Sequence, residues 1–226
     1  MPGTHFYSGG LLERAYVSAK RARDTAVNNL SDDALVAIIL AASAAECFIN
    51  DMAGLLKSLA AVPQRPNDHA FARLIKVGEA MDSIEKDNLG ILPKYRVAAL
   101  LLDCKEIDDG REPMQSFTQV SLLRNGIVHA RPVSTEERSK YATIVANLAQ
   151  RGLCKQIDET KKNTMDAETW WVVMRTPEVA LWAARSANNL MIELAAAMEA
   201  VGDYQGLIAG FSNQLRSQAA LHAAIS

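Results

Sequence analysis

The stretch SDDALVAIILAASAAECFINDMAGLLKSLAA, residues 31–61, contains the longest near-apolar run of this chain and indicates its fold. Alanine and leucine dominate the stretch, and both residues favour helix. Ser31, Asp32 and Asp33 supply an N-cap side chain and a negatively charged first turn, so a helix should start here. The near-apolar run, residues 34–45, predicts a helix that is buried on most sides.

The sequence on either side of this stretch also predicts helices, so we expect an all-α chain. β-Branched alternation is scarce, and glycine and proline fall between long helical windows. The expected further helices cover residues 11–29, 70–87, 93–104, 114–130, 135–150, 177–201 and 203–225. Residues 158–174 are first polar and then read TWWVVM, which fits either a short strand or a packed loop.

Length and composition indicate a single domain over residues 1–226. A chain of 226 residues with 49% hydrophobic and 22% charged content can bury a sizeable core, and two domains are the outer limit. Within this domain we expect residues 203–226 to form a C-terminal appendage or a partner-binding tail. Trp170, Trp171 and Trp182 stand beside apolar residues, so core packing is the default expectation for them.

Charge and cysteine content narrow the possible partners and the compartment. A formal net charge of −2 argues against binding nucleic acid or membrane by bulk electrostatics, so any phosphate binding must come from a local patch. Cys47, Cys104 and Cys154 are odd in number and far apart, which indicates reduced thiols rather than disulfides or a zinc site. The N-terminus does not resemble a secretory signal, and residues 34–45 are too short to cross a bilayer. We therefore expect a cytoplasmic protein without a membrane partner.

The most specific chemistry lies in LLRNGIVHARP, residues 122–132, near the end of the predicted helix 114–130. Arg124, Asn125 and His129 fall within one and a half turns of it. A permanent cation, an amide and an imidazole that titrates near neutral pH are the groups needed to cut RNA without a metal. At about 100° per residue, Asn125 and His129 share one face and Arg124 projects beside them.

Gly126 is unusual at the centre of this motif. Glycine inside a helix costs about 1 kcal/mol relative to alanine, so its presence suggests the close approach of another backbone or of a ligand. A two-fold interface would satisfy this condition, because the same helix of a second subunit could pack there.

The motif resembles that of the HEPN superfamily, helical bundles whose nuclease members carry R-x4–6-H, commonly with Asn directly after the Arg. Arg124, Asn125 and His129 match that pattern position for position. The resemblance spans about residues 32–132. It includes SAAECFINDM (residues 43–52), KYRVAALLLD (residues 94–103) and the loop that ends at Pro113, and residues 176–201 resemble a closing bundle helix.

The resemblance implies an antiparallel helical bundle that cleaves RNA, independently of metal, at a composite site formed by a homodimer. In such a site His129 would transfer protons, Arg124 would clamp the phosphate and Asn125 would have an orienting role. Glu46 would tether Arg124 or His129, as the family's early acidic residue does, with Asn50 as a weaker candidate. The family context implies a role in defence or in a toxin–antitoxin pair, which makes an antitoxin protein a candidate partner beside RNA.

Other readings of the same residues stay open. The sequence has no H-E-x-x-H, no Walker loop and no Glu-x-x-His pair, so we expect neither a metal ion nor a cofactor. Arg124, Asn125 and His129 could form an exposed helix edge whose histidine stabilises its own helix. Glu46 could be an ordinary buried carboxylate. The second functional hypothesis is a non-catalytic helical module that binds RNA, a nucleotide or a protein partner.

Overall fold

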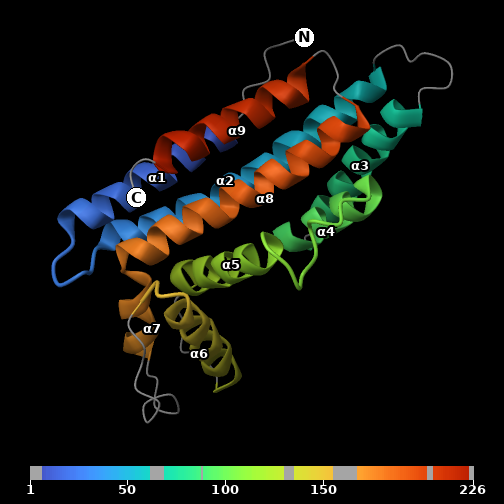
Figure 1. The fold of residues 1–226 in the computed structure, drawn as a ribbon. Helices are drawn as coiled ribbons and strands as arrows, with labels where there is room; N and C mark the ends of the chain where they lie inside the picture. The colour runs from blue at the N-terminus through green and yellow to red at the C-terminus, as the bar shows by residue number, and fades with distance from the viewer. Residues whose placement is uncertain are drawn as a thin grey trace.

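The computed structural model describes residues 7–61, 69–87, 89–129, 135–154, 167–202 and 206–223. Within these ranges the chain forms a helical bundle without any strand, which confirms the all-α prediction (Figure 1). Parts of the HEPN-like span, residues 62–68, 88 and 130–132, lie outside the described residues. The same holds for residues 203–205 and 224–226 of the C-terminal segment.

The helices begin and end close to the predicted positions. They are α1 (Ser8–Thr25), α2 (Asp32–Ser58), a 3-10 turn (Leu59–Ala61), α3 (His69–Lys86), α4 (Ile91–Leu102), α5 (Met114–Val128), α6 (Thr135–Gln150), α7 (Ala167–Met174), α8 (Pro177–Val201) and α9 (Leu207–Ala223). Ser31 caps α2 as expected, since the backbone N–H of Asp33 donates to Ser31 Oγ at 3.3 Å. α1 ends at Thr25, before the predicted residue 29, because Ala26 leaves the helical conformation with a ψ angle of 128°; Asn28 and Asn29 then turn the chain with positive φ angles of 53° and 64°.

α2 and α8 form the centre of the bundle. Small side chains such as Ala41, Ala45 and Ala184 are fully buried and let neighbouring helices approach closely. The N–H of Ser31 donates to the carbonyl of Arg175 at 2.8 Å, which joins the starts of the two helices, and they run in the same direction (Figure 1). α1 runs back along α2. The expected antiparallel arrangement therefore holds for α1 and α2, whereas α2 and α8 are parallel.

The remaining bundle helices cover this central pair. α3 crosses the end of α2 so closely that a Cβ at Gly78 would lie 2.8 Å from both Leu56 Cβ and Lys57 N. α4 and α5 continue this layer along α8 and α2. α9 packs on α8 and α1, where Gln218 Nε2 donates to the carbonyl of Gly9 at 3.1 Å. The C-terminal helix is thus part of the packed bundle.

α7 corrects the expectation of a strand or loop within residues 158–174; residues 158–166 lie outside the described residues. Trp170, Val173 and Met174 are all buried, and their spacing places them on one helical face. Val172, between them, is 44% exposed. A short apolar run does not show whether its hydrophobic residues repeat with the period of a helix or of a strand. Packing against the bundle therefore determines that this segment is helical.

α2 extends beyond the near-apolar run of residues 34–45, as the helix predicted to about residue 61 requires. Among the described helices, the segment Asp32–Ala61 is the one long and apolar enough, by length and composition, to cross a membrane. Half of its most apolar window is buried inside the bundle, and the core helix of a soluble protein passes the same test.

Candidate functional site

α5 carries the Arg-Asn motif, and a polar cluster holds its first turn in place. The backbone N–H and the hydroxyl of Ser116 donate to the Glu112 carboxylate at 3.3 and 2.7 Å. Arg151, just beyond α6, donates to Ser116 Oγ at 2.7 Å and pairs with Glu112 at 3.0 Å. These contacts satisfy a backbone donor in the first turn of α5 and tie the start of the helix to Arg151.

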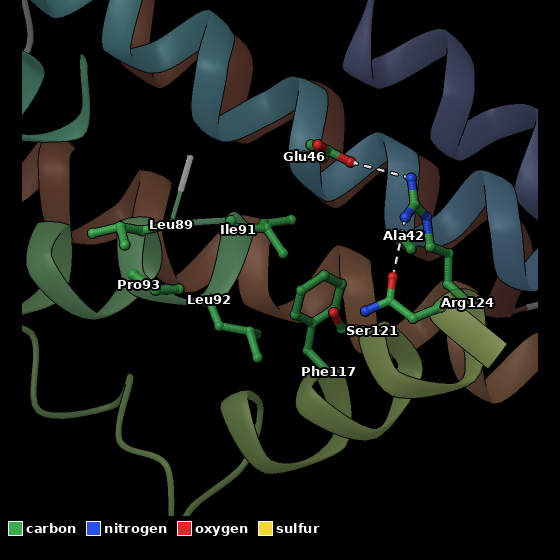
Figure 2. Close-up of a pocket in the computed structure, with 11 residues that line it drawn as sticks. Ala42, Glu46, Leu89, Ile91, Leu92, Pro93, Phe117, Ser121 and Arg124 are labelled. Atoms are coloured by element: carbon green, nitrogen blue, oxygen red, sulfur yellow. Dashed lines mark hydrogen bonds and ion pairs between the residues drawn. The ribbon is translucent and has the colours of Figure 1, made fainter. Parts of the chain in front are cut away.

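Arg124 is held between two acceptors from different helices. Its Nη1 donates to Asn125 Oδ1 at 3.0 Å, and its Nη2 lies 3.8 Å from Glu46 Oε2 on α2 (Figure 2). The Arg124 side chain is 29% exposed and that of Glu46 is 50% exposed. The guanidinium is therefore oriented by the protein and still accessible from solvent.

His129 lies at the end of α5 with its side chain exposed. The helix stops at Val128, and the backbone N–H of His129 donates to the carbonyl of Asn125 at 2.9 Å. The structure therefore brings three of the four predicted site residues into contact, namely Arg124, Asn125 and Glu46. His129 follows one turn later on the same helix and contributes nothing to the pocket beside them.

That pocket lies where α2, α4 and α5 meet and has a volume of about 270 Å³ (Figure 2). One end is polar and the other is apolar. The lining residues are Ala42 and Glu46 of α2, Leu89 to Pro93 around the start of α4, and Phe117, Ser121, Arg124 and Asn125 of α5.

Sequence reasoning missed most of this lining. Phe117 precedes Arg124 and Asn125 by about two helical turns and Ser121 precedes them by about one, so the spacing alone could have placed all four on one face of α5. The start of α4 could not have been found in this way. It reaches the pocket only through the packing of α4 near α2.

Asn50, the weaker tether candidate, has a different partner. It accepts a hydrogen bond at 2.5 Å from Nζ of Lys94, whose side chain is only 2% exposed. Lys94 also pairs with Glu85 of α3. A buried ammonium needs such partners, so Asn50 helps to satisfy Lys94 and leaves Glu46 as the acidic partner of Arg124.

Gly126 corrects the expectation that a second subunit fills the space beside it. A Cβ at this position would lie 2.6 Å from Tyr141 Oη and 3.0 Å from Trp170 of the same chain. Tyr141 and Trp170 stack with ring centroids 4.7 Å apart, and Trp170 stacks on Trp171 at 5.2 Å. The glycine therefore admits aromatic side chains from α6 and α7, and it carries no argument for a dimer.

None of the three cysteines lines the pocket. Burial raises the pKa of the Cys47 thiol to about 11, and the neighbouring Asp51 carboxylate adds to this rise. Burial also raises the pKa values of Cys104 and Cys154. In the described part of the chain no three His, Cys, Asp or Glu side chains cluster closely enough to hold a metal ion.

Comparison of the chain with protein-family models, with curated proteins and with solved structures finds no match. The resemblance to the HEPN superfamily therefore rests on the motif residues themselves.

Proposed function

We propose that this protein is a metal-independent endoribonuclease of the HEPN type, acting in the cytoplasm as a homodimer, in a defence or toxin–antitoxin context. The observation that supports it best is the setting of Arg124. A partly exposed guanidinium is oriented by Asn125 and Glu46 at the edge of a pocket, and His129 stands exposed one turn away.

The chemistry follows from the needs of RNA cleavage. The 2′-hydroxyl attacks the adjacent phosphate, the bond to the 5′-oxygen breaks, and one proton moves from the nucleophile while another reaches the leaving oxygen. Arg124 would stabilise charge on the non-bridging oxygens, and His129 would transfer a proton. DNA would not be cut, because it lacks the 2′-hydroxyl.

Asn125 and Glu46 would act by orienting Arg124. An arginine side chain that is already held in one orientation loses less conformational entropy on binding phosphate than a freely rotating one. The 3.8 Å contact with Glu46 is longer than a tight ion pair, so a phosphate could draw the guanidinium away from it.

The position of His129 supports the homodimer part of the proposal. Its side chain is exposed and lines no part of the pocket beside Arg124 of its own chain. A second copy could bring its histidine to this arginine and complete a composite site.

The test is cleavage of single-stranded RNA by purified protein in the presence of EDTA. We expect His129→Ala and Arg124→Ala each to lower the cleavage rate by roughly 10²–10³-fold, as loss of an acid–base group or of a charge-stabilising donor does. His69→Ala is the matched control, because His69 is also an exposed histidine but starts α3. Undiminished cleavage by His129→Ala, or complete loss of activity in EDTA, would contradict the proposal.

One observation favours the second candidate, a non-catalytic module that binds RNA through the same surface. Arg124 already contacts Asn125 and Glu46, and His129 does not line the pocket of its own chain. If wild-type protein binds RNA but leaves it intact, and Arg124→Ala weakens the binding, the binding module is the correct function.

A further inference from the structure

The end of the pocket away from Arg124 has an apolar lining that phosphate binding does not explain. Leu89, Ile91, Leu92 and Pro93 line it from the start of α4, and Figure 2 shows Phe117 of α5 facing them. Leu89 is 57% exposed, so this end is open to solvent. An open apolar surface inside a pocket suits a ligand with an apolar face.

The other end of the same pocket offers hydrogen-bonding groups. Ser121 supplies a hydroxyl, Asn125 an amide and Arg124 a guanidinium, all from one face of α5. Hydroxyl and amide groups both donate and accept, which is what the edge of a nucleobase requires. A single flat ring with polar groups on its edge could therefore contact the apolar wall and the polar end of the pocket at the same time.

The start of α4 adds donors on the apolar side. Gly90 is the N-cap residue, with φ of 80° and no side-chain cap. The first N–H groups of a helix have no acceptor within the helix, and this end of the helix carries partial positive charge. Carbonyl oxygens of a base would be favoured next to it.

We propose that this pocket binds one unstacked nucleobase of single-stranded RNA, next to a phosphate held by Arg124. The inference rests on the proposed function and adds a base subsite to it. The volume of about 270 Å³ lies just below the range of roughly 300–1,000 Å³ that holds drug-sized ligands. This volume suits one base.

The experiment is an abasic scan by fluorescence anisotropy with wild-type protein. The probe is a short single-stranded oligonucleotide with 2′-fluoro riboses, which cannot undergo attack by a 2′-hydroxyl. An abasic residue is placed at each position in turn. We expect one position at which removal of the base weakens binding roughly ten-fold, as loss of one bound base does, with little effect elsewhere.

Leu92→Trp fills the apolar end and should weaken binding of the intact probe by a similar factor, removing the dependence on that position. Leu100→Trp is the matched control, because Leu100 lies on the same helix, is 80% exposed and does not line the pocket. It should leave the scan unchanged. Binding with a flat abasic profile in the wild type would overturn the base subsite alone, whereas no binding of any RNA probe would overturn the proposed function as well.

Discussion

Arg124 shows how a single side chain acquires a defined position in a chain with little net charge. The guanidinium lies between an amide on its own helix and a carboxylate on α2, at 3.0 and 3.8 Å. A formal net charge of −2 argues against anion binding by bulk electrostatics, so anion binding has to depend on such local placement. The partners of Arg124 therefore matter as much to the proposed site as the arginine itself.

Cys47 allows a prediction about pH-dependent reactivity. Its Sγ lies 3.5 Å from Asp51 Oδ2, and burial and the Asp51 charge both raise its pKa, to about 11. The thiolate is the reactive form, and each unit of increase in pKa lowers its fraction about ten-fold at a pH well below the pKa. We expect Cys47 to alkylate more slowly than a free cysteine at mildly alkaline pH.

Asp51→Asn should lower the pKa of Cys47 and speed its alkylation, as measured by mass spectrometry of iodoacetamide adducts. Cys154 is the internal control, since its raised pKa comes from burial alone. An unchanged Cys47 rate in Asp51→Asn would show that the carboxylate does not affect the thiol.

The helices differ in how far their own sequences determined them. A helix was predicted over residues 31–61, and α2 covers Asp32–Ser58 with the 3-10 turn Leu59–Ala61 after it, because a capping serine, two acidic residues and a long apolar run all favour the same helix. α7 was missed because TWWVVM contains β-branched and aromatic residues that suit a strand equally well. Its helix forms where three of its side chains are buried together on one face.

The crossing of α3 over α2 gives a prediction about stability. Gly78→Ala should destabilise the fold by up to about 2 kcal/mol, because overpacking usually costs about 1–3 kcal/mol and helix propensity returns about 1 kcal/mol. The new methyl group would meet Leu56 Cβ and Lys57 N at 2.8 Å, and neither atom can move without the α2 backbone.

Gly54→Ala is the matched control for that variant. Gly54 also lies within a helix, but no atom stands within 4 Å of a Cβ built there. It should stabilise the protein by about 0.5–1 kcal/mol through helix propensity alone. Urea denaturation measures the free energy of unfolding of both variants. If both substitutions change it by the same amount in the same direction, the close contact between α2 and α3 is contradicted.

Taken as a whole, the bundle surrounds α2 and α8 with other helices, and α6 and α7 stand at one end (Figure 1). The contact of α6 and α7 with α5 involves Tyr141 and Trp170 beside Gly126. Segments with fewer buried contacts open locally at lower free energy. We expect amide hydrogen exchange in the middle of α6 to be faster than in the middle of α2 and α8.

Trp170→Ala should accelerate exchange in α6 further while leaving α2 close to wild type, because it removes the stacking partner of Tyr141. Hydrogen exchange with mass spectrometry measures both effects. Equal protection of α6 and α2 in the wild-type protein would show that the bundle opens only as a single unit.

Part of the candidate site was predictable, for reasons tied to particular residues. Arg124 and Asn125 are adjacent on one helix, and the family resemblance indicated Glu46 as a tether for Arg124 or His129; the structure places both Asn125 and Glu46 beside Arg124. Their catalytic roles stay predictions. Leu89, Ile91 and Leu92 were not foreseen, because they belong to the start of another helix and carry no chemical signature.

The sequence by itself determined the helical class, most helix boundaries and the cap at Ser31. These depend on interactions between residues a few positions apart, which the order of the residues specifies. Only the tertiary structure decided that α2 and α8 run in parallel, that Gly126 faces Tyr141 and Trp170, and that a pocket opens beside Arg124. The physical reason is that these features arise where side chains distant in sequence compete for the same space, and packing between whole helices settles that competition.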